Sequence, residues 1–185
     1  YYLMKFKKFK FKKVKSTNDT AIRIIKNSNL KFGMIVSDTQ VNGKGQRGNK
    51  WFSYKGNLFV SFFHELKNLN ISLNSLTEIN CLLVKKILNR YYKNNITFKK
   101  PNDLLINKKK ISGILQEIIS ISDKKFLIIG IGVNLVKSPK IKDYPTTSLF
   151  ELTNNHINKS KFENQLKEIF EKHLTKMYKI GNKFS

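Results

Sequence analysis

The sequence predicts an α+β domain in which a mixed, mainly antiparallel sheet is backed by helices. Two observations support this prediction. Short segments with apolar and β-branched residues recur between tight polar turns, which is typical of a meander of strands. Two longer segments carry apolar residues three and four positions apart, which is typical of amphipathic helices. A chain of 185 residues with 40% apolar content is long enough for one such domain with a substantial core.

The first half of the chain is predicted to contain strands, one helix and a glycine-rich loop. The first fourteen residues alternate apolar and basic side chains, above all in Phe9-Lys10-Phe11-Lys12, and predict an edge strand. Ser16 is placed as a helix N-cap, and the apolar face after it predicts a short helix ending near Asn27. Residues 33–39 are predicted to form a strand that enters the loop, and residues 57–63 a strand that leaves it.

The second half is predicted to contain a helix, a meander of strands and a closing helix. The long amphipathic helix of the domain is expected over residues 73–92, from the spacing of Leu76, Ile79, Leu83, Ile87 and Tyr91. Four strands are expected at residues 96–98, 103–106, 111–121 and 125–136, with polar turns at 107–109 and 122–124. The closing helix, residues 162–178, would turn Phe162, Leu166, Ile169, Phe170, Leu174 and Met177 inward. Because no repeat or linker divides the chain, residues 1–185 are expected to form a single domain.

The chain is strongly basic, with 36 lysine and arginine residues against 12 aspartate and glutamate residues and a formal net charge of +24. Such a balance ordinarily suggests nucleic acid or an anionic membrane surface as a partner. Here the lysines are scattered over every segment together with many asparagines and isoleucines, so a biased composition explains them better than a binding patch. The charge should still favour encounter with acidic partners.

Cysteine, histidine and apolar runs exclude several classes of protein. Cys81 is the only cysteine, so the chain can form no intramolecular disulfide, and its place on an apolar helix face predicts a buried structural thiol. The longest nearly apolar run, residues 126–136, is too short to span a bilayer, and the N-terminus lacks the apolar region of a signal peptide. A cytoplasmic protein in a reducing compartment is therefore expected. The histidines are too widely separated to predict a zinc site.

The most informative segment is residues 38–51, D-T-Q-V-N-G-K-G-Q-R-G-N-K-W, in which glycines alternate with cations. Glycines that can take positive φ let backbone N–H groups approach a ligand closely, and the cations supply charge for a phosphate or carboxylate. The glycines are Gly43, Gly45 and Gly48, and the cations are Lys44, Arg47 and Lys50. A Walker loop is excluded, because no Gly-Lys-Ser/Thr opens a helix. The alternative is a solvated basic hairpin, with Trp51 as a core anchor.

Four further segments stand in order with this loop, and the set is similar to a known family. They are Ser16-Thr17-Asn18, Lys99-Lys100-Pro101-Asn102-Asp103, Lys110-Ile111-Ser112-Gly113-Ile114-Leu115-Gln116-Glu117 and Gly130-Ile131-Gly132-Val133-Asn134. The set resembles the biotin protein ligases, whose patterns are S-T-N, Q-x-x-G-R-G-R-x-G-R-x-W, K-W-P-N-D, K-x-x-G-I-L-x-E and G-I-G-x-N. The resemblance covers residues 14–150 and implies the class II synthetase-like catalytic domain of the biotin and lipoate ligases.

The resemblance implies ATP-dependent attachment of biotin, through biotinyl-5'-AMP, to one lysine of a biotin carboxyl carrier domain of a biotin-dependent carboxylase. Mg²⁺ is expected with ATP because the ion neutralises the departing pyrophosphate, whereas no protein metal ligand is expected. Both steps bring anions together, so cations should stabilise the transition state. The chain is expected to act as a monomer or homodimer, without DNA or a membrane.

The resemblance also implies roles for individual residues. Lys110 should reach both the biotin carboxylate and the α-phosphate, Asp103 should act near the incoming lysine or the metal, and Arg47 completes the catalytic set. The biotin-binding set is Ser16, Thr17, Asn18, Gln40, Gly43, Lys110 and Gly113. The ATP-binding set is Lys44, Arg47, Trp51, Asn102 and Asn134. Glu117 is a further candidate helper. The alternatives are a helix cap for Ser16, an exposed turn lysine for Lys110, a simple turn for Asn102-Asp103 and a bulged core strand at residues 130–134.

The sequence departs from the family's patterns at three positions. Gln46 and Asn49 replace arginines of the glycine loop, and Lys100 replaces the tryptophan of K-W-P-N-D, so affinity for the intermediate is in doubt although the reaction type is not. Neither a winged-helix DNA-binding domain nor the small β-barrel that usually follows the catalytic domain is evident, so a repressor is not expected.

Three rival functions remain open. A lipoate ligase or octanoyltransferase shares the implied fold, and the glycine loop is the feature that favours biotin. A basic nucleic-acid-binding module would suit the charge, but the aromatic residues are not interleaved with basic ones beyond the N-terminal strand. A degenerate ligase would bind biotin without turnover.

Overall fold

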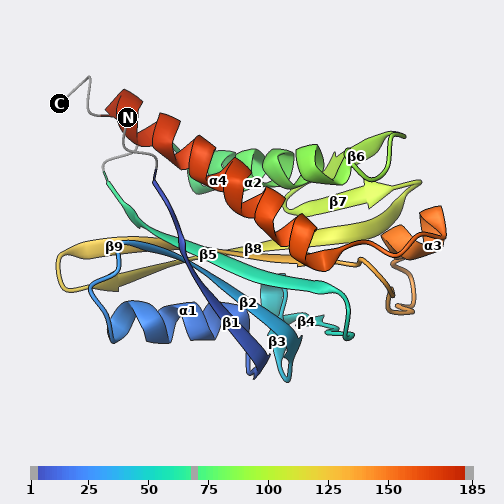
Figure 1. Cartoon of the computed structure of the whole chain (residues 1–185), viewed down its shortest axis with the longest axis horizontal. Coiled ribbons are helices and arrows are strands. Elements are labelled where there is room, and N and C mark those ends of the chain that lie inside the picture. Colours follow the sequence, from blue (N-terminus) through green and yellow to red (C-terminus); the bar gives the residue numbers. More distant parts are fainter. Residues whose placement is uncertain (1–3, 68–70, 182–185) are drawn as a thin grey trace.

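The computed structural model describes residues 4–67 and 71–181 and confirms the predicted α+β class (Figure 1). A seven-stranded sheet has the order β1-β2-β5-β9-β8-β7-β6, in which β1 pairs with β2 in parallel and the other pairs are antiparallel. Its strands are β1 (Lys7–Val14), β2 (Phe32–Gln40), β5 (Leu58–Leu66), β6 (Ile96–Lys99), β7 (Asp103–Ile106), β8 (Lys109–Ile121) and β9 (Lys124–Val133). The predicted edge strand is confirmed as β1.

Helices cover both faces of this sheet, as Figure 1 shows. α2 (Leu73–Leu88) and α4 (Lys159–Gly181) lie on one face, whereas α1 (Thr17–Lys26) and a small hairpin of β3 (Gly43–Lys44) and β4 (Lys50–Trp51) lie on the other. A short helix, α3 (Leu149–Thr153), follows the last strand. The Ser-Thr-Asn group therefore begins α1, and Ser16 is its N-cap as predicted, with its side chain accepting a hydrogen bond from the Asp19 N–H.

The main differences from the prediction are the ends of α2 and β9 and one additional helix. α2 ends at Leu88, because the N–H groups of residues 90 and 91 bond to carbonyls three residues back and the chain tightens into turns. The longest helix of the described chain is therefore α4 and not the predicted 73–92 helix. β9 ends at Val133, and the carbonyls of Asn134 and Leu135 then accept from the N–H groups of Leu149 and Phe150 at the start of α3. α3 was not predicted, because five residues are too few for a period to be recognised.

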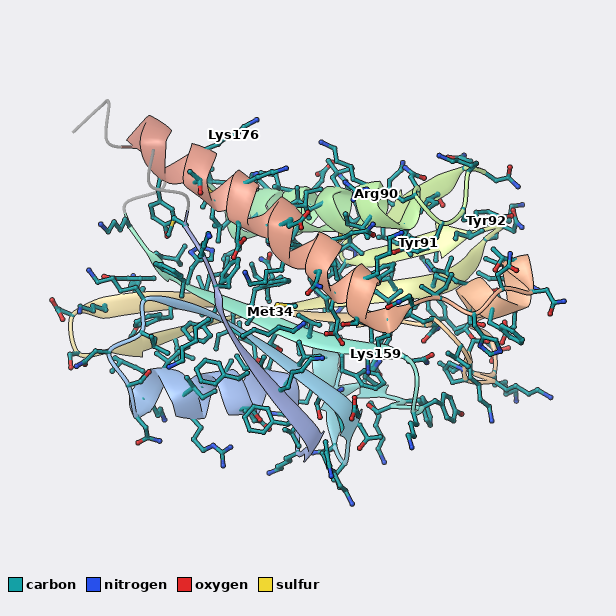
Figure 2. The ribbon with its side chains drawn as sticks, viewed as in Figure 1. Met34, Arg90, Tyr91, Tyr92, Lys159 and Lys176 are labelled. Carbon is teal, nitrogen blue, oxygen red and sulfur yellow. The ribbon has the colours of Figure 1, made fainter. Side chains whose placement is uncertain are left out.

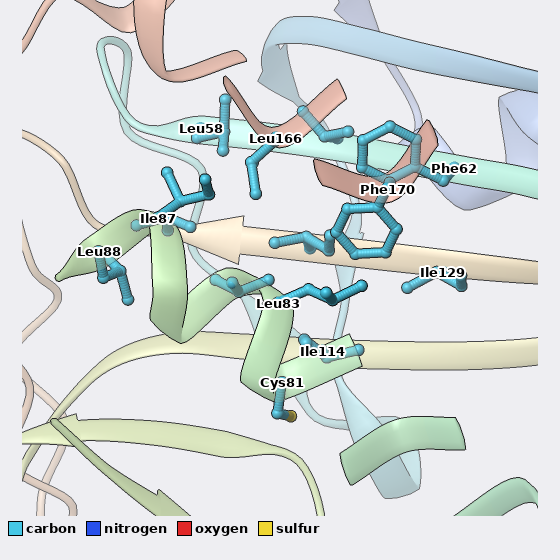
Figure 3. Packing of buried hydrophobic residues seen from close by; sticks show 14 of the residues in the cluster. Leu58, Phe62, Cys81, Leu83, Ile87, Leu88, Ile114, Ile129, Leu166 and Phe170 are labelled. Atoms are coloured by element: carbon cyan, nitrogen blue, oxygen red, sulfur yellow. The ribbon is translucent and has the colours of Figure 1, made fainter. Parts of the chain in front are cut away.

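The main core lies between the sheet and the pair α2 and α4. Phe62 of β5 stacks on Phe170 of α4 with ring centroids 4.4 Å apart and contacts Phe6 at 5.0 Å. Figure 3 shows Phe62, Phe170, Leu83 and Ile87 meeting between these elements, with Cys81 in the same layer. Burial raises the pKa of the Cys81 thiol to about 12. The prediction that Cys81 is a buried structural thiol is thus confirmed.

The N-terminal segment is held along α4 by acidic side chains of that helix. The Phe6 N–H donates to Glu171 at 2.7 Å, and the Lys8 ammonium lies 2.7 Å from Glu163. Both carboxylates are buried, at 3% and 5% exposure, so these charged contacts are partly shielded from solvent. Figure 2 shows Lys159 near the first turn of α4. Lys176 lies near the other end of this helix and is directed away from the sheet.

The opposite face is apolar over only part of its length. Ala21 and Ile25 of α1 pack with Ile35, Phe63, Phe126 and Ile128 of the sheet. Successive side chains of a strand point to opposite faces, so Gly130 and Gly132 follow Ile128 on this same face of β9. The change from large residues to glycines leaves space above the strand, beside the N-terminus of α1.

Candidate active site

A cleft of about 570 Å³ occupies this space. Its wall is formed by the N-terminus of α1, the glycine loop, the ends of β7, β8 and β9, and the segment from Pro139 to Thr146. Every residue of the predicted biotin and ATP sets lines the cleft except Gly43. Gly43 is buried behind Gln40, where a Cβ atom would lie 2.9 Å from the Gln40 amide nitrogen and 2.5 Å from the Trp51 carbonyl oxygen. Its contribution is to permit that close packing.

A network of polar side chains surrounds the N-terminus of α1 at the cleft. The Thr17 N–H and hydroxyl both donate to the side-chain amide oxygen of Gln40, at 2.8 and 3.2 Å. The Ser61 hydroxyl of β5 donates to the side-chain amide oxygen of Asn18 at 2.5 Å and also lies 2.8 Å from the Thr17 hydroxyl. The Asn18 amide donates to Glu117 at 2.6 Å. The orientations of these side chains are therefore fixed by one another before any ligand binds.

The glycine loop forms another part of the cleft wall, and its backbone is a β-hairpin. β3 pairs with β4, the Gly45 N–H donates to the Asn49 carbonyl at 2.7 Å, and the turn between them is a short 3₁₀ segment. Of the three glycines, Gly48 alone takes positive φ, at 77°, so the expectation for Gly43 and Gly45 was wrong; Arg47 takes φ of 55° instead. The hairpin alternative is correct for the backbone, although its residues also line the cleft.

Lys44 attaches this hairpin to α1. Its ammonium lies 2.5 Å from Asp19, in the first turn of the helix, and both side chains are partly exposed. The hydrogen bond to Asp19 raises the pKa of Lys44. Lys44 is thus a fixed cation at the mouth of the cleft, beside Arg47.

The Trp51 ring lies directly on the backbone of two strands. A Cβ atom on Gly132 would be 2.3 Å from the ring, and one on Gly113 would be 2.9 Å from it. A Cβ on Gly130 would similarly be 2.4 Å from the Asn18 side chain. These glycines are required because side chains cross the sheet here, which explains G-x-G in β9 by packing. The Trp51 Nε1–H is buried and has no hydrogen-bond partner among the described residues.

A charged pair lies in the middle of the cleft. Lys110, at the start of β8, places its ammonium 2.9 Å from the Asp103 carboxylate, and their side chains are 19% and 13% exposed. The same ammonium lies 5.3 Å from the centre of the Trp51 ring. The neighbours Lys108 and Lys109 are exposed on the turn, so Lys110 is not the exposed turn lysine of the alternative interpretation.

Two predicted ATP residues use their amides within the protein. The Asn102 amide donates to the Ile114 carbonyl at 2.7 Å, which joins the turn before β7 to β8. The Asn134 amide donates to the Thr147 carbonyl at 3.1 Å, and Asn134 is 2% exposed. Both residues also line the cleft, so each combines a structural bond with a place on the cleft wall.

Ser61 and Tyr144 were missed by sequence reasoning. Ser61 is an ordinary polar residue in a strand, and only the register of β5 places it beneath Asn18. Tyr144 belongs to a segment without a periodic pattern, and its hydroxyl donates to the Asp103 carboxylate. Neither residue belongs to any of the five motifs, so no signal in the sequence identified them.

The three departures from the family patterns occupy different places. Gln46 is half-buried and lines the cleft, and Asn49 lines it from an exposed position. Lys100 is exposed and does not line the cleft. The loss of charge at positions 46 and 49 therefore affects the cleft directly, whereas the change at Lys100 lies outside its lining.

Residues 4–67 and 71–181 contain no group of three or more histidine, cysteine, aspartate or glutamate residues arranged to hold a metal ion. In the same part of the chain, no helix has the length and hydropathy needed to cross a membrane.

Comparison with known proteins identifies the family. The sequence profile of the biotin/lipoate A/B protein ligase family matches residues 10–134. The chain belongs to this family. Biotin–protein ligase 2 of Arabidopsis thaliana is 34% identical over 131 residues, which are 66% of this chain and 37% of that protein. The bifunctional ligase/repressor BirA of Escherichia coli (strain K12) is 31% identical over 109 residues, which are 57% of this chain and 34% of that protein.

The fold of this family member is also similar to solved structures. The biotin protein ligase from Aquifex aeolicus in complex with biotin and ATP matches with a TM-score of 0.76 and 29% identity, over 92% of this chain and 71% of that chain. The chain spans about a third of the length of the curated relatives described above, 34% and 37%. The family profile, residues 10–134, includes every lining residue of the cleft except Pro139, Ile141, Tyr144 and Thr146.

Proposed function

We propose that this chain is the catalytic part of a biotin protein ligase, which forms biotinyl-5'-AMP from biotin and ATP and transfers the biotinyl group to a lysine of a biotin carboxyl carrier domain. One observation carries the proposal. The half-buried Lys110 lies in a single cleft that is also lined by the polar side chains at the start of α1 and by the cationic hairpin. One curated relative is named a biotin–protein ligase, and one solved relative is a biotin protein ligase in complex with biotin and ATP.

The polar side chains at the N-terminus of α1 suit the ureido ring of biotin. A buried urea needs partners for its N–H and carbonyl groups, at a cost of about 1–3 kcal/mol for each group left unpaired. Ser16, Thr17, Asn18 and Gln40 provide both donors and acceptors, and mutual hydrogen bonds hold them in place. Gly113 and Gly132 leave the adjacent strands without side chains, so the apolar tail of the ligand can lie near the Trp51 ring.

The cations that line the cleft suit the phosphates of ATP. In the first step a biotin carboxylate oxygen attacks the α-phosphorus of ATP, the new P–O bond forms, and pyrophosphate leaves with the electron pair of the broken P–O bond. Two anions approach each other, so the cations of Lys110, Arg47 and Lys44 lower the barrier by offsetting their repulsion. Mg²⁺ would enter with ATP and be held mainly by the phosphate oxygens, because the described residues contain no cluster of acidic side chains at the cleft.

The acceptor of the second step is a lysine of the carrier domain. Asp103 would face the incoming ammonium group and accept a proton, since it is the carboxylate that lines the middle of the cleft. The excess of basic residues favours approach of an acidic carrier surface. The oligomeric state, monomer or homodimer, remains a prediction.

Biotin-dependent ATP–pyrophosphate exchange tests the proposal. The chain with Mg²⁺, labelled pyrophosphate and biotin should return label to ATP, whereas lipoate or octanoate in place of biotin should not support exchange. Exchange that runs with lipoate and fails with biotin would show that the chain belongs to the lipoate branch. Biotin binding without any exchange would instead identify a degenerate ligase.

A further inference from the structure

Tyr144 forms a contact with the charged pair that no motif of the family contains. Its hydroxyl donates a hydrogen bond to one oxygen of Asp103, Oδ2. The other oxygen, Oδ1, is buried beside the Lys110 ammonium at 2.9 Å, yet it accepts no aligned hydrogen bond within the described residues. The Asp103 carboxylate thus has one oxygen that accepts from the Tyr144 hydroxyl and one buried oxygen that lies against the Lys110 ammonium.

Two cations lie over the Tyr144 ring. The Lys99 ammonium lies 4.4 Å from the ring centre and the Lys110 ammonium lies 5.4 Å from it. Cations over an aromatic face are attracted by the ring quadrupole. The ring therefore has favourable contacts that restrict its orientation and direct its hydroxyl toward Asp103.

The backbone around Tyr144 is also fixed to β8. The Lys110 N–H donates to the Pro145 carbonyl at 2.8 Å, and the Thr147 N–H donates to the Lys110 carbonyl at 2.9 Å. Both bonds use the backbone of Lys110, and their partners lie one and three residues after Tyr144. Tyr144 is consequently held in register with Lys110, although the two residues belong to different segments of the chain.

The hydroxyl remains a donor at neutral pH. Burial, the hydrogen bond to Asp103 and the charge of that carboxylate together raise the pKa of Tyr144 above its ordinary value. A protonated phenol can only donate its hydrogen toward a carboxylate, so the bond fixes the carboxylate plane. A carboxylate that must accept a proton from an incoming group acts efficiently only when it is held within hydrogen-bond reach of that group.

We propose that Tyr144 is a positioning residue for transfer to the acceptor lysine, holding the Asp103 carboxylate in the orientation in which it receives a proton from the incoming ammonium. This inference rests on the proposed biotin ligase function. Asp103 takes one proton from the ammonium, and the freed nitrogen pair attacks the carbonyl carbon of biotinyl-5'-AMP. The C–N bond forms, the C–O bond to AMP breaks, and AMP leaves with that electron pair. The remaining extra proton on nitrogen passes to solvent, as does the proton on Asp103, and the amide results.

Single-turnover transfer from enzyme-bound biotinyl-5'-AMP tests the inference. Tyr144→Phe removes the hydroxyl and keeps the ring beside its cations. Transfer to the lysine of a biotin carboxyl carrier domain should fall about tenfold, the rate equivalent of one charge-assisted hydrogen bond. Transfer to hydroxylamine should be unchanged, because this nucleophile is already unprotonated at neutral pH and needs no base. Pyrophosphate exchange, which involves no amine, should also be unchanged.

Tyr54→Phe is the matched control, because Tyr54 also has a lysine ammonium over its ring, Lys137 at 4.8 Å, but does not line the cleft. It should leave all three rates at the parent value. An equal fall of all three rates in Tyr144→Phe would make Tyr144 a structural residue and overturn the inference. Unchanged transfer to lysine would overturn it as well. A parent chain that shows no biotin-dependent exchange would overturn the proposed function itself, and the inference with it.

Discussion

The face of the sheet beneath α2 and α4 buries a continuous apolar core, whereas the face beneath α1 is apolar only at one end and polar at the other. Along β9 the residues of the α1 face pass from Phe126 and Ile128 to Gly130 and Gly132. The residues of the other face, Leu127, Ile129 and Ile131, stay large throughout. One strand thus supplies uniform packing to one face and a step from filled to open space on the other.

The two faces also treat charge differently. His64 on the helix-covered face is 1% exposed, and burial lowers its pKa to about 4, so it stays neutral. Lys110 and Asp103 on the cleft face form an ion pair while remaining partly exposed. The comparison indicates that stability depends mainly on the face beneath α2 and α4, and chemistry mainly on the cleft face. Substitutions on each face should therefore separate the two properties.

The largest effect is expected in the covered core. Phe62→Ala removes a ring that stacks on Phe170 and contacts Phe6, and it leaves a cavity in a closely packed layer. The free energy of unfolding should fall by about 3–5 kcal/mol. Urea titration monitored by circular dichroism measures this change, with the exposed Leu82→Ala as a control on α2. A loss below about 1 kcal/mol would show that this face does not carry the stability.

Lys110→Ala should have the largest effect on the cleft face. Without the cation, the repulsion between carboxylate and α-phosphate is no longer offset, and the rate of pyrophosphate exchange should fall by about a hundredfold, or roughly 3 kcal/mol. Biotin binding without ATP should change less. Lys108→Ala, at the neighbouring exposed turn position, is the matched control. Similar exchange rates for Lys110→Ala and the parent would exclude Lys110 as the catalytic cation.

The neutral His64 predicts a pH dependence of stability. Its pKa is about 4 in the folded chain and near 6.5 when unperturbed, because burial disfavours the charged ring, with a smaller contribution from His173. Between these values the unfolded chain binds a proton that the folded chain does not. The free energy of unfolding should therefore fall as the pH decreases through this window, by up to about 3 kcal/mol, and this contribution is constant at lower pH.

His64→Gln isolates this contribution from that of the carboxylates. Its free energy of unfolding should decrease less than that of the parent between about pH 7 and pH 5. The ring nitrogen of His64 lies 2.9 Å from the Tyr178 hydroxyl, so the variant should also be less stable at neutral pH. Equal pH slopes in urea titrations of the two proteins would contradict the prediction.

Gly132→Ala tests whether the open part of β9 exists to admit Trp51. The added Cβ would be 2.3 Å from the indole ring, so the ring must move outward and the hairpin that carries it must shift. Pyrophosphate exchange should slow several-fold, while the free energy of unfolding should change by no more than about 1–3 kcal/mol. Trp51 is the only tryptophan, so its fluorescence should shift to longer wavelength. Gly113→Ala, with a predicted contact of 2.9 Å, should show a smaller shift; an unchanged spectrum in both would refute the packing role.

The smallest effect is expected at Gln46. This half-exposed residue lines the cleft where the family has arginine, and a neutral amide forms weaker hydrogen bonds to a phosphate than a guanidinium does. We therefore expect biotinyl-5'-AMP to dissociate readily and label bystander proteins, and we expect Gln46→Arg to slow its dissociation several-fold. Asn155→Arg adds the same charge at an exposed site outside the cleft lining and serves as the control. An unchanged off-rate would mean that another cation, such as Lys44 or Lys50, already supplies this charge.

Much of the fold could be predicted from the sequence, because local periodicity states which side of each element is buried. Alternation gave the strands, the three-and-four spacing gave α4, and the five ordered motifs predicted the residues that the fold brings into one cleft. The parallel pairing of β1 with β2 could not be predicted from either strand, since the alternation of apolar and polar residues does not indicate strand direction. The end of α2 was misplaced because Tyr91 keeps the helical spacing and still packs on Phe162 after the helix has ended.

The tertiary structure alone decided how the cleft residues are held. Tyr144 meets Asp103 across 41 positions, and Ser61 meets Asn18 across 43, so no local pattern could join them. The purpose of Gly130 and Gly132 was likewise hidden, because a glycine in a strand records only that space is needed and not which side chain enters it. Sequence determines the periodicity and chemical type of each segment, whereas contacts between distant segments exist only once strand order and register are set.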